Sequence, residues 1–221
     1  MRIAVWYNLT SGGAKRALYH QVRGLVDRGH HVETWCTPAS QDGYLPLRDV
    51  VAREHVIPVG EWRLSLGSWA YYMEHQRRFR AIDKHCRACA KEINQGGFDV
   101  FLGNSCGDLV VSPIGRYVEG PKVLYLPEPR RWLYETDLGH APRRRNPFLA
   151  AYSASARQAQ RDEELQSARA YDLLLANSLY SREALLRAYG LESSVCHLGV
   201  DASLFQMVER SEERRVGKEL Y

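Results

Sequence analysis

Short apolar runs alternate along the chain with longer stretches in which apolar residues recur at helical spacing. Each run is four to six residues long and rich in β-branched or aliphatic residues, which is typical of buried strands. The runs occupy residues 3–7, 31–36, 55–59, 100–103, 122–126, 173–176 and 194–198. Strands that alternate with helices in this way predict a mainly parallel sheet joined by crossover helices.

The stretches between these runs predict four helices. Between the first two runs one helical face carries apolar residues, and Gly29 follows it as a helix-ending glycine. Three further helices are expected over residues 68–93, 147–170 and 178–189. Ser178 suits the N-cap of the last one, and Gly190 closes it. The sequence therefore predicts a Rossmann-like, doubly wound α/β domain with helices on both faces of the sheet.

Chain length limits this organisation to one such domain. A chain of 221 residues holds one substantial α/β domain but is short for two. We assign residues 1–205 to the domain. Residues 206–221 have many charges and no core periodicity, so they are interpreted as a charged linker that follows the domain.

Composition favours a soluble protein of a reducing compartment. Hydrophobic residues make up 45% of the chain, but no apolar run reaches the roughly 20 residues of a membrane span. The start, MRIAVWYNL, resembles a first strand more than a signal peptide. Five scattered cysteines are an odd number, which favours reduced thiols. These features predict a cytoplasmic protein.

Arginines cluster at residues 77–80, 130–131, 143–145 and 214–215, within a net charge of +4. Such clusters suit an anionic substrate or an acidic membrane surface. Several aromatic residues support peripheral contact with an anionic membrane at its inner face, namely Trp69, Tyr71, Tyr72, Trp132 and Phe148. The alternative is that the arginines lie on solvated faces and the aromatics pack in the core or a cleft.

The turn after the first strand is the first candidate site. Ser11, Gly12 and Gly13 lead directly into a helix that also carries Arg16. Adjacent glycines allow a backbone to approach a ligand closely, and the free N–H groups of a helix start attract phosphate. The turn lacks the Walker and the dinucleotide-binding patterns, and no acidic residue ends the second strand, which argues against nicotinamide binding. A glycine turn without a ligand is the alternative.

A second candidate site follows the strand at residues 122–126. The loop after it contains Glu128, Arg130, Arg131 and Trp132, with prolines on both sides of Glu128. Ligands of open α/β sheets bind outside the carboxyl ends of the strands. Asn104, Ser105 and Asp108 follow another strand end, so we expect them to line the same cleft. The alternative is a surface loop held by Arg–Glu pairs.

Other motifs are interpreted as structural. Cys86 and Cys89 share a helical face beside His85, but no second ligand pair has the spacing of a zinc site. Buried cysteines are the better interpretation, and no metal site is predicted. No serine, histidine and aspartate set has recognisable spacing, and nothing resembles a nucleic-acid-binding module.

Several segments together resemble the N-terminal domain of family 4 retaining glycosyltransferases, which have the GT-B fold. They are MRIAVWYNLTSGGAKRAL, RGHHVETW, LYLPEPRRWLYE and, most specifically, YDLLLANSLYSREALLRAYGLESSVCHLGVDASLF. The resemblance implies transfer of a sugar from a nucleotide-sugar donor to a glycan or lipid-linked acceptor, without cofactor or metal. It further implies that Gly12 and Gly13 lie beside the donor diphosphate and the acceptor. The loop at residues 127–135 would face the acceptor.

The chain departs from this family in two respects. Many relatives carry a histidine where Pro127 stands, so Glu128 is the nearest candidate for acceptor deprotonation, provided that a partly buried loop raises its pKa. The motifs of the donor half have no counterpart here, so we expect the isolated chain to need its own C-terminal domain or a partner chain for activity. A non-catalytic module that binds a glycan or a nucleotide is the alternative.

Overall fold

The computed structural model describes residues 1–41, 43–61, 71–134 and 147–200. It contains one sheet of seven parallel strands in the order β3-β2-β1-β4-β5-β6-β7. The strands are β1 (Arg2–Asn8), β2 (His31–Cys36), β3 (Arg53–Val56), β4 (Val100–Cys106), β5 (Lys122–Tyr125), β6 (Leu173–Ala176) and β7 (Ser194–Val195). The predicted fold class is confirmed.

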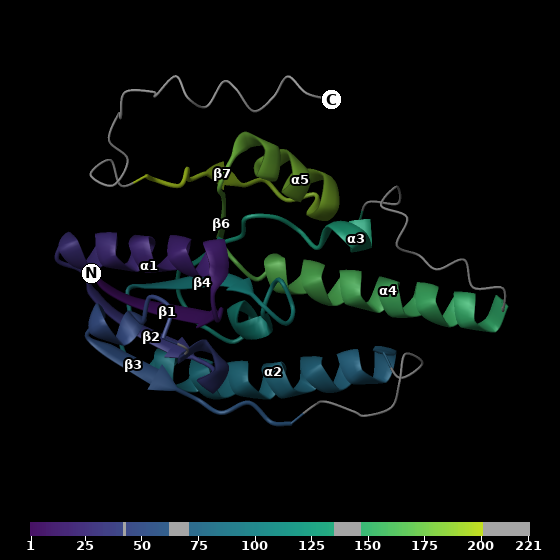
Figure 1. Ribbon diagram of the computed structural model, residues 1–221, viewed down its shortest axis with the longest axis horizontal. Coiled ribbons are helices and arrows are strands. Elements are labelled where there is room, and N and C mark those ends of the chain that lie inside the picture. Colours follow the sequence, from purple (N-terminus) through teal and green to yellow (C-terminus); the bar gives the residue numbers. More distant parts are fainter. Residues whose placement is uncertain (42, 62–70, 135–146, 201–221) are drawn as a thin grey trace, which may run out of the picture.

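Helices cover both faces of this sheet (Figure 1). They are α1 (Gly12–Asp27), α2 (Tyr71–Gln95), α3 (Arg131–Tyr134), α4 (Pro147–Ala168) and α5 (Leu179–Tyr189), with 3-10 turns at Pro38–Gln41, Leu47–Asp49 and Pro113–Arg116. In Figure 1, α1 lies on one side of β1 and β2, and α2 lies on the other side.

The core is divided in two by the sheet. Side chains of a strand alternate between its faces, so Val5 and Tyr7 of β1 pack with α1, whereas Ala4 and Trp6 pack with α2. Five consecutive residues of β1 are fully apolar or aromatic and buried. Burial on both faces is the reason that the strands of a parallel sheet appear as continuous apolar runs in a sequence.

Two predicted strands end three residues before the expected position. The expected strand at residues 55–59 is β3, which ends at Val56 because its partner β2 ends at Cys36. The expected strand at residues 194–198 is β7, which ends at Val195 because its partner β6 ends at Ala176. The proposed boundary at residues 205 and 206 lies outside the described residues, as does the start of the helix expected at residue 68.

The start and the end of α5 confirm its predicted caps. Ser178 has an extended backbone, and its Oγ accepts a hydrogen bond from the amide of Ser181 at 3.1 Å. Gly190 has a φ of 65°, a left-handed conformation that favours glycine. The helix position is therefore defined by local chemistry that is visible in the sequence.

The cysteines have the structural role predicted for them. All five are free, and Cys86 and Cys89 are buried, which raises the pKa of both thiols. Between them and β1, His85 Nε2 accepts a hydrogen bond from Trp6 Nε1 at 3.1 Å. Within the described ranges, no three side chains of the metal-ligating types form a cluster suited to an ion.

Among the residues that the structure describes, no helix combines the length and the apolar character required to cross a bilayer.

Candidate functional site

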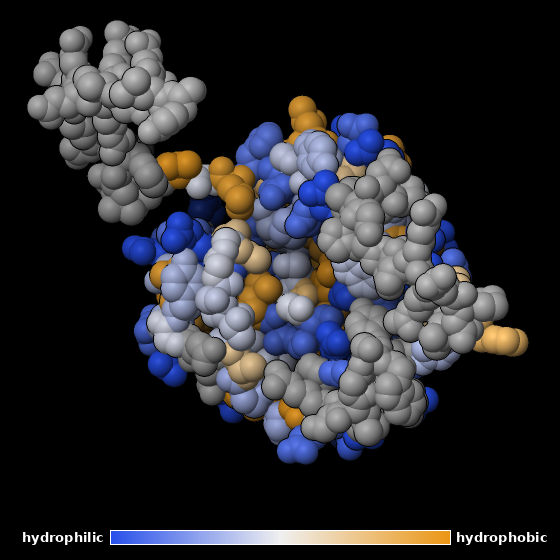
Figure 2. Space-filling view, turned by 45° about the vertical axis from the view of Figure 1, so that its right-hand side comes forward, coloured by the Kyte–Doolittle hydropathy of each residue, from blue (hydrophilic) through white to orange (hydrophobic). Residues whose placement is uncertain are grey.

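The carboxyl ends of the strands meet at one edge of the sheet, where the order of the strands reverses. From β1 the chain moves outward to β2 and β3, and then returns to β4 on the other side of β1. In open α/β sheets such a reversal creates a crevice outside the carboxyl ends of the two central strands. Figure 2 turns this edge toward the reader and shows a hollow in which hydrophilic and hydrophobic residues alternate.

Two clefts lie at this edge, on either side of the start of α1. We call the first the Asn8 cleft; it has a volume of about 580 Å³ and lies over the ends of β1, β2 and β3. The second, the Arg130 cleft, has a volume of about 590 Å³ and lies over the ends of β4, β5 and β6. The start of α1 therefore separates the two clefts.

The glycine turn gives α1 an open N-terminus. Ser11 has an extended backbone with φ −154° and makes no side-chain cap hydrogen bond, while Gly12 has a φ of 89° in the left-handed region. No acidic residue lies in the first turn of α1. The first amide N–H groups of a helix have no intrahelical partner, and the helix dipole makes this end partly positive. The turn is thus suited to an anionic group such as a phosphate.

Asn8 connects the ends of three strands. Its Nδ2 donates to Asp108 Oδ2 at 2.8 Å, and its Oδ1 accepts from Thr37 Oγ1 at 2.8 Å. Its backbone oxygen also accepts from the amide of Gly107 at 2.9 Å. Asn8 is 6% exposed. One buried amide side chain thus sets the positions of the loops after β1, β2 and β4.

The Arg130 cleft gathers residues from the loops after β4 and β5. Glu128, Arg130 and Arg131 line it, together with Ser105 and Gly13. Arg130 Nη2 donates to the backbone oxygen of Asp108 at 3.2 Å. The two candidate sites of the sequence, the glycine turn and the loop at residues 127–132, are therefore brought together in one cleft.

The predicted site residues are divided between these clefts. Gly13, Ser105, Glu128, Arg130 and Arg131 line the Arg130 cleft, whereas Ser11 and Asp108 line the Asn8 cleft. Gly12 lies between them in the chain.

Gly12 itself lines neither cleft, and neither do Arg16 and Asn104. Arg16 is on the exposed side of α1, where its Nε donates to Tyr44 Oη at 3.0 Å. Asn104 is 1% exposed, so its side chain belongs to the interior. Glu128 is exposed rather than partly buried. The burial that we expected for Glu128 is therefore not found.

The clefts differ in charge among the described residues. Asp108 is the only charged residue that lines the Asn8 cleft, with Thr10, Ser11 and Thr37 as neutral polar groups. Two arginines and one glutamate line the Arg130 cleft. Arginine is well suited to a diphosphate because its planar guanidinium pairs with two oxygens. The Arg130 cleft is thus the more favourable of the two for an anion.

Lys15 of α1 does not add charge to either cleft. It is fully buried, its Nζ lies 3.9 Å from the centre of the Tyr7 ring, and it donates to the Ser40 backbone oxygen at 3.5 Å. Burial lowers the pKa of the Lys15 amine. Through its hydrogen bond to Ser40, the Lys15 side chain contacts the 3-10 turn at Pro38–Gln41.

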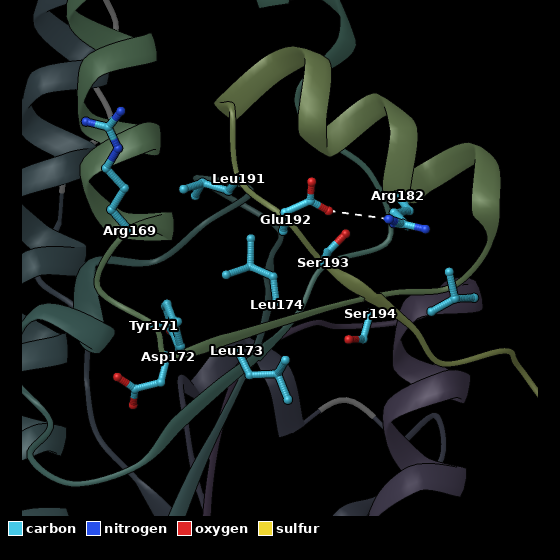
Figure 3. A pocket seen from close by; sticks show the side chains of 11 residues that line it. Arg169, Tyr171, Asp172, Leu173, Leu174, Arg182, Leu191, Glu192, Ser193 and Ser194 are labelled. Atoms are coloured by element: carbon cyan, nitrogen blue, oxygen red, sulfur yellow. Dashed lines mark hydrogen bonds and ion pairs between the residues drawn. The ribbon is translucent and has the colours of Figure 1, made fainter.

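A third depression lies at the opposite edge of the sheet, before the starts of β6 and β7 (Figure 3). At about 670 Å³ it is larger than either cleft. Its charged residues do not converge: Arg182 pairs with Glu192 at 3.4 Å, while Arg169 and Asp172 lie apart from them. Asp172 Oδ2 accepts from the amide of Lys122 at 2.8 Å. We therefore assign no functional role to this depression.

The arginine clusters and the aromatic residues have different surroundings. Arg77 and Arg80 are exposed on α2, and Trp132 and Phe148 are also exposed. Arg78 instead reaches the site, where its Nη1 donates to the Asp108 backbone oxygen at 3.5 Å. Trp69 and the clusters at residues 143–145 and 214–215 lie outside the described residues, and the side chains of Tyr71 and Tyr72 are not described.

Comparison with known proteins identifies similar folds but no close relative. No protein family matches the sequence, and no curated protein is similar to it. Many solved structures match the fold. Arabidopsis thaliana UGT89C1 complexed with UDP-L-rhamnose has a TM-score of 0.55 at 14% identity, over 90% of this chain and 51% of that chain.

Two further structures give similar values. The E. coli structure described as trehalose-6-phosphate bound with UDP-2-fluoro glucose has a TM-score of 0.52 at 13% identity, over 92% of this chain and 50% of that one. CalG4, the calicheamicin glycosyltransferase, has a TM-score of 0.50 at 14% identity, over 90% and 52%. This chain spans about half the length of each. The expected fold, a Rossmann-like domain corresponding to half of a GT-B fold, is confirmed.

Substitution of Asn8 tests whether this side chain holds the site together. Asn8→Ala leaves Thr37 and Asp108 without their buried partner, so we expect it to lower the free energy of unfolding by about 1–3 kcal/mol. Ser11→Ala, in the same loop, removes no cap hydrogen bond and should change it by less than about 0.5 kcal/mol. Urea denaturation measures both values. Equal stability of the two variants would contradict the role of Asn8.

Proposed function

We propose that this chain is the acceptor-side half of a nucleotide-sugar glycosyltransferase. The observation that carries the proposal is the Arg130 cleft, in which an open helix N-terminus and two arginines meet at the reversal of the strand order. These groups suit a diphosphate. Three solved structures of similar fold are described as bound to UDP-sugars or as a glycosyltransferase.

Each cleft has a separate part in the proposal. The donor diphosphate lies beside the start of α1 and Arg130, with Gly12 and Gly13 allowing its close approach. The acceptor extends into the Asn8 cleft, where Asp108 and the hydroxyl groups of Thr10 and Thr37 suit a hydroxyl-rich ligand. The acceptor would be a glycan or a lipid-linked glycan.

The finer features of the proposal rest on the resemblance of the sequence. They are transfer with retention of configuration, membership of family 4, transfer of a hexose, and independence of a metal. In this half, the start of α1 and Arg130 are the candidate donor-binding features. Both are proposed to contact the diphosphate, which leaves most of the nucleotide without contacts. The remainder of the donor site would come from a second half, supplied by the same protein or by a partner chain.

The isolated 221-residue chain should transfer no sugar. Because the chain spans half the length of the similar structures, we expect the remaining donor contacts to lie outside it. Incubation with radiolabelled UDP-glucose and a panel of glycan acceptors measures transfer directly. Transfer at an ordinary enzymatic rate would overturn this prediction. If a longer form of the protein bound a glycan but transferred no sugar, a non-catalytic binding module would be favoured instead.

We propose Glu128 for deprotonation of the acceptor on its position alone, because it lies in the Arg130 cleft beside the glycine turn although it is exposed rather than partly buried. In a form of the protein that transfers sugar, Glu128→Gln should lower kcat by about 100-fold or more with little change in KM. Glu183→Gln, an exposed residue paired with Arg187 on α5, is the matched control. An unchanged kcat in Glu128→Gln would refute the role.

Peripheral contact with an anionic membrane, at the inner face of the cytoplasmic membrane, is a further part of the proposal. Arg77 and Arg80 are exposed, and so is Trp132 at the edge of the Arg130 cleft. We expect the chain to sediment with phosphatidylglycerol vesicles and to be released by added salt, because screening weakens exposed charges. Vesicles of phosphatidylcholine alone are the control. Equal sedimentation with both would contradict an electrostatic contact.

A further inference from the structure

Glu164 is a buried carboxylate that three elements share. It lies on α4 and is 5% exposed. Its Oε1 accepts a hydrogen bond from the hydroxyl group of Tyr189, at the end of α5, and from the backbone amide of Arg130 at 3.3 Å. Its Oε2 lies 3.8 Å from Arg130 Nε. One carboxylate therefore contacts both the backbone and the side chain of Arg130.

Arg130 transmits this contact to the candidate site. Its guanidinium is largely buried, and Nη2 donates to the backbone oxygen of Asp108 in the loop after β4. The same residue lines the Arg130 cleft. A second anchor lies one turn earlier on α4, where the Arg161 guanidinium donates to the backbone oxygen of Leu133. The C-terminal end of the loop between β5 and α3, and α3 itself, are thus fixed to α4.

The electrostatic surroundings of Glu164 explain why its effect is directed at Arg130. Burial raises the pKa of the Glu164 carboxyl group, and the hydrogen bond from Tyr189 and the charge of Arg130 oppose that shift. His75 also opposes the rise in the pKa of Glu164, and Tyr134 is a further titratable neighbour. Arg130 is the cation in contact with the Glu164 carboxylate. The charge state of Glu164 therefore determines whether the Arg130 guanidinium is held in its position.

We propose that Glu164 is a positioning residue, which holds Arg130 in place at the wall of the Arg130 cleft. The significance of Glu164 for catalysis rests on the proposed function. The contact between Glu164 and Arg130 does not depend on that function. Glu164 touches neither cleft directly and acts through Arg130. Neighbouring Glu163 has a different partner, since its Oε2 lies 3.2 Å from His75 Nε2.

The experiment follows the Arg130 Nε–Hε group by NMR in the 221-residue chain, without any ligand. The Arg130→Lys variant, which lacks the signal, identifies it. Glu164→Gln keeps an oxygen that accepts from Tyr189 and from the Arg130 amide, but it removes the charge. Arg130 Nε makes no hydrogen bond to any residue that the structure describes, so removing the Glu164 charge disrupts an ion pair at this atom. Loss of that ion pair should let the largely buried guanidinium reach water, and we expect its Nε–Hε proton to exchange about tenfold faster or more in Glu164→Gln. The matched control, Glu163→Gln, should leave this rate within about twofold.

The wild-type chain provides a second readout that requires no variant to fold. The Arg130 Nε shift should titrate with a midpoint above the ordinary glutamate pKa of about 4.3, because burial raises the pKa of Glu164. Above that midpoint Glu164 is ionised and holds the Arg130 guanidinium. As the pH falls through the midpoint, Glu164 is protonated and the guanidinium is released. Glu164→Gln should abolish this titration, and Glu163→Gln should retain it.

Two results would overturn the proposal: an Arg130 signal that is unaffected by Glu164→Gln, or one that responds equally to Glu163→Gln. A general loosening of the fold is distinguished by the backbone amide spectrum, which should change only near residues 128–133 and around the substituted residue and its partner Tyr189. No nucleotide sugar is used. Failure of the chain to take part in sugar transfer would therefore refute the proposed function and leave this result unaffected.

Discussion

The site depends on one constraint of the fold, the reversal of strand order between β1 and β4 in a sheet whose strands are all parallel. Parallel pairing places every carboxyl end at the same edge, and the reversal leaves a crevice there that no crossover connection covers. Asn8 and Asp108 are far apart in the sequence, yet their side chains are 2.8 Å apart at this crevice. The two clefts exist because the loops diverge on either side of α1.

Polar contacts then hold these loops in position. Asn8 joins the loops after β1, β2 and β4, and α4 holds the loop after β5 through Glu164 and Arg161. Most of these groups are buried, where an unpaired hydrogen-bonding group costs about 1–3 kcal/mol. The loops are therefore as well defined as the strands that they follow. A site built in this way is organised before a ligand arrives, which reduces the cost of binding.

The difference in charge between the clefts connects this framework with the proposed function. The Arg130 cleft combines arginines with an open helix start, whereas the Asn8 cleft offers hydroxyl groups and one carboxylate. An anionic donor and a hydroxyl-rich acceptor would meet at the glycine turn between them. The depression before β6 and β7 is larger than either cleft, but it lacks such a division of charge and lies at the opposite edge. Chemistry rather than volume thus identifies the site.

The sequence by itself determined the elements of this protein, because their causes are local. Apolar periodicity predicted the seven strands and four helices but not the short α3, which lies in a segment expected to be a loop, and Ser178 and Gly190 predicted the ends of α5. It also indicated that Gly13, Glu128 and Arg130 follow strand ends. Only the tertiary structure decided which cleft each residue lines, that Asn104 is interior and that Arg16 contacts Tyr44. The roles of Asn8 and Glu164 were likewise hidden, since their partners are distant in sequence and meet only through the strand order and helix packing.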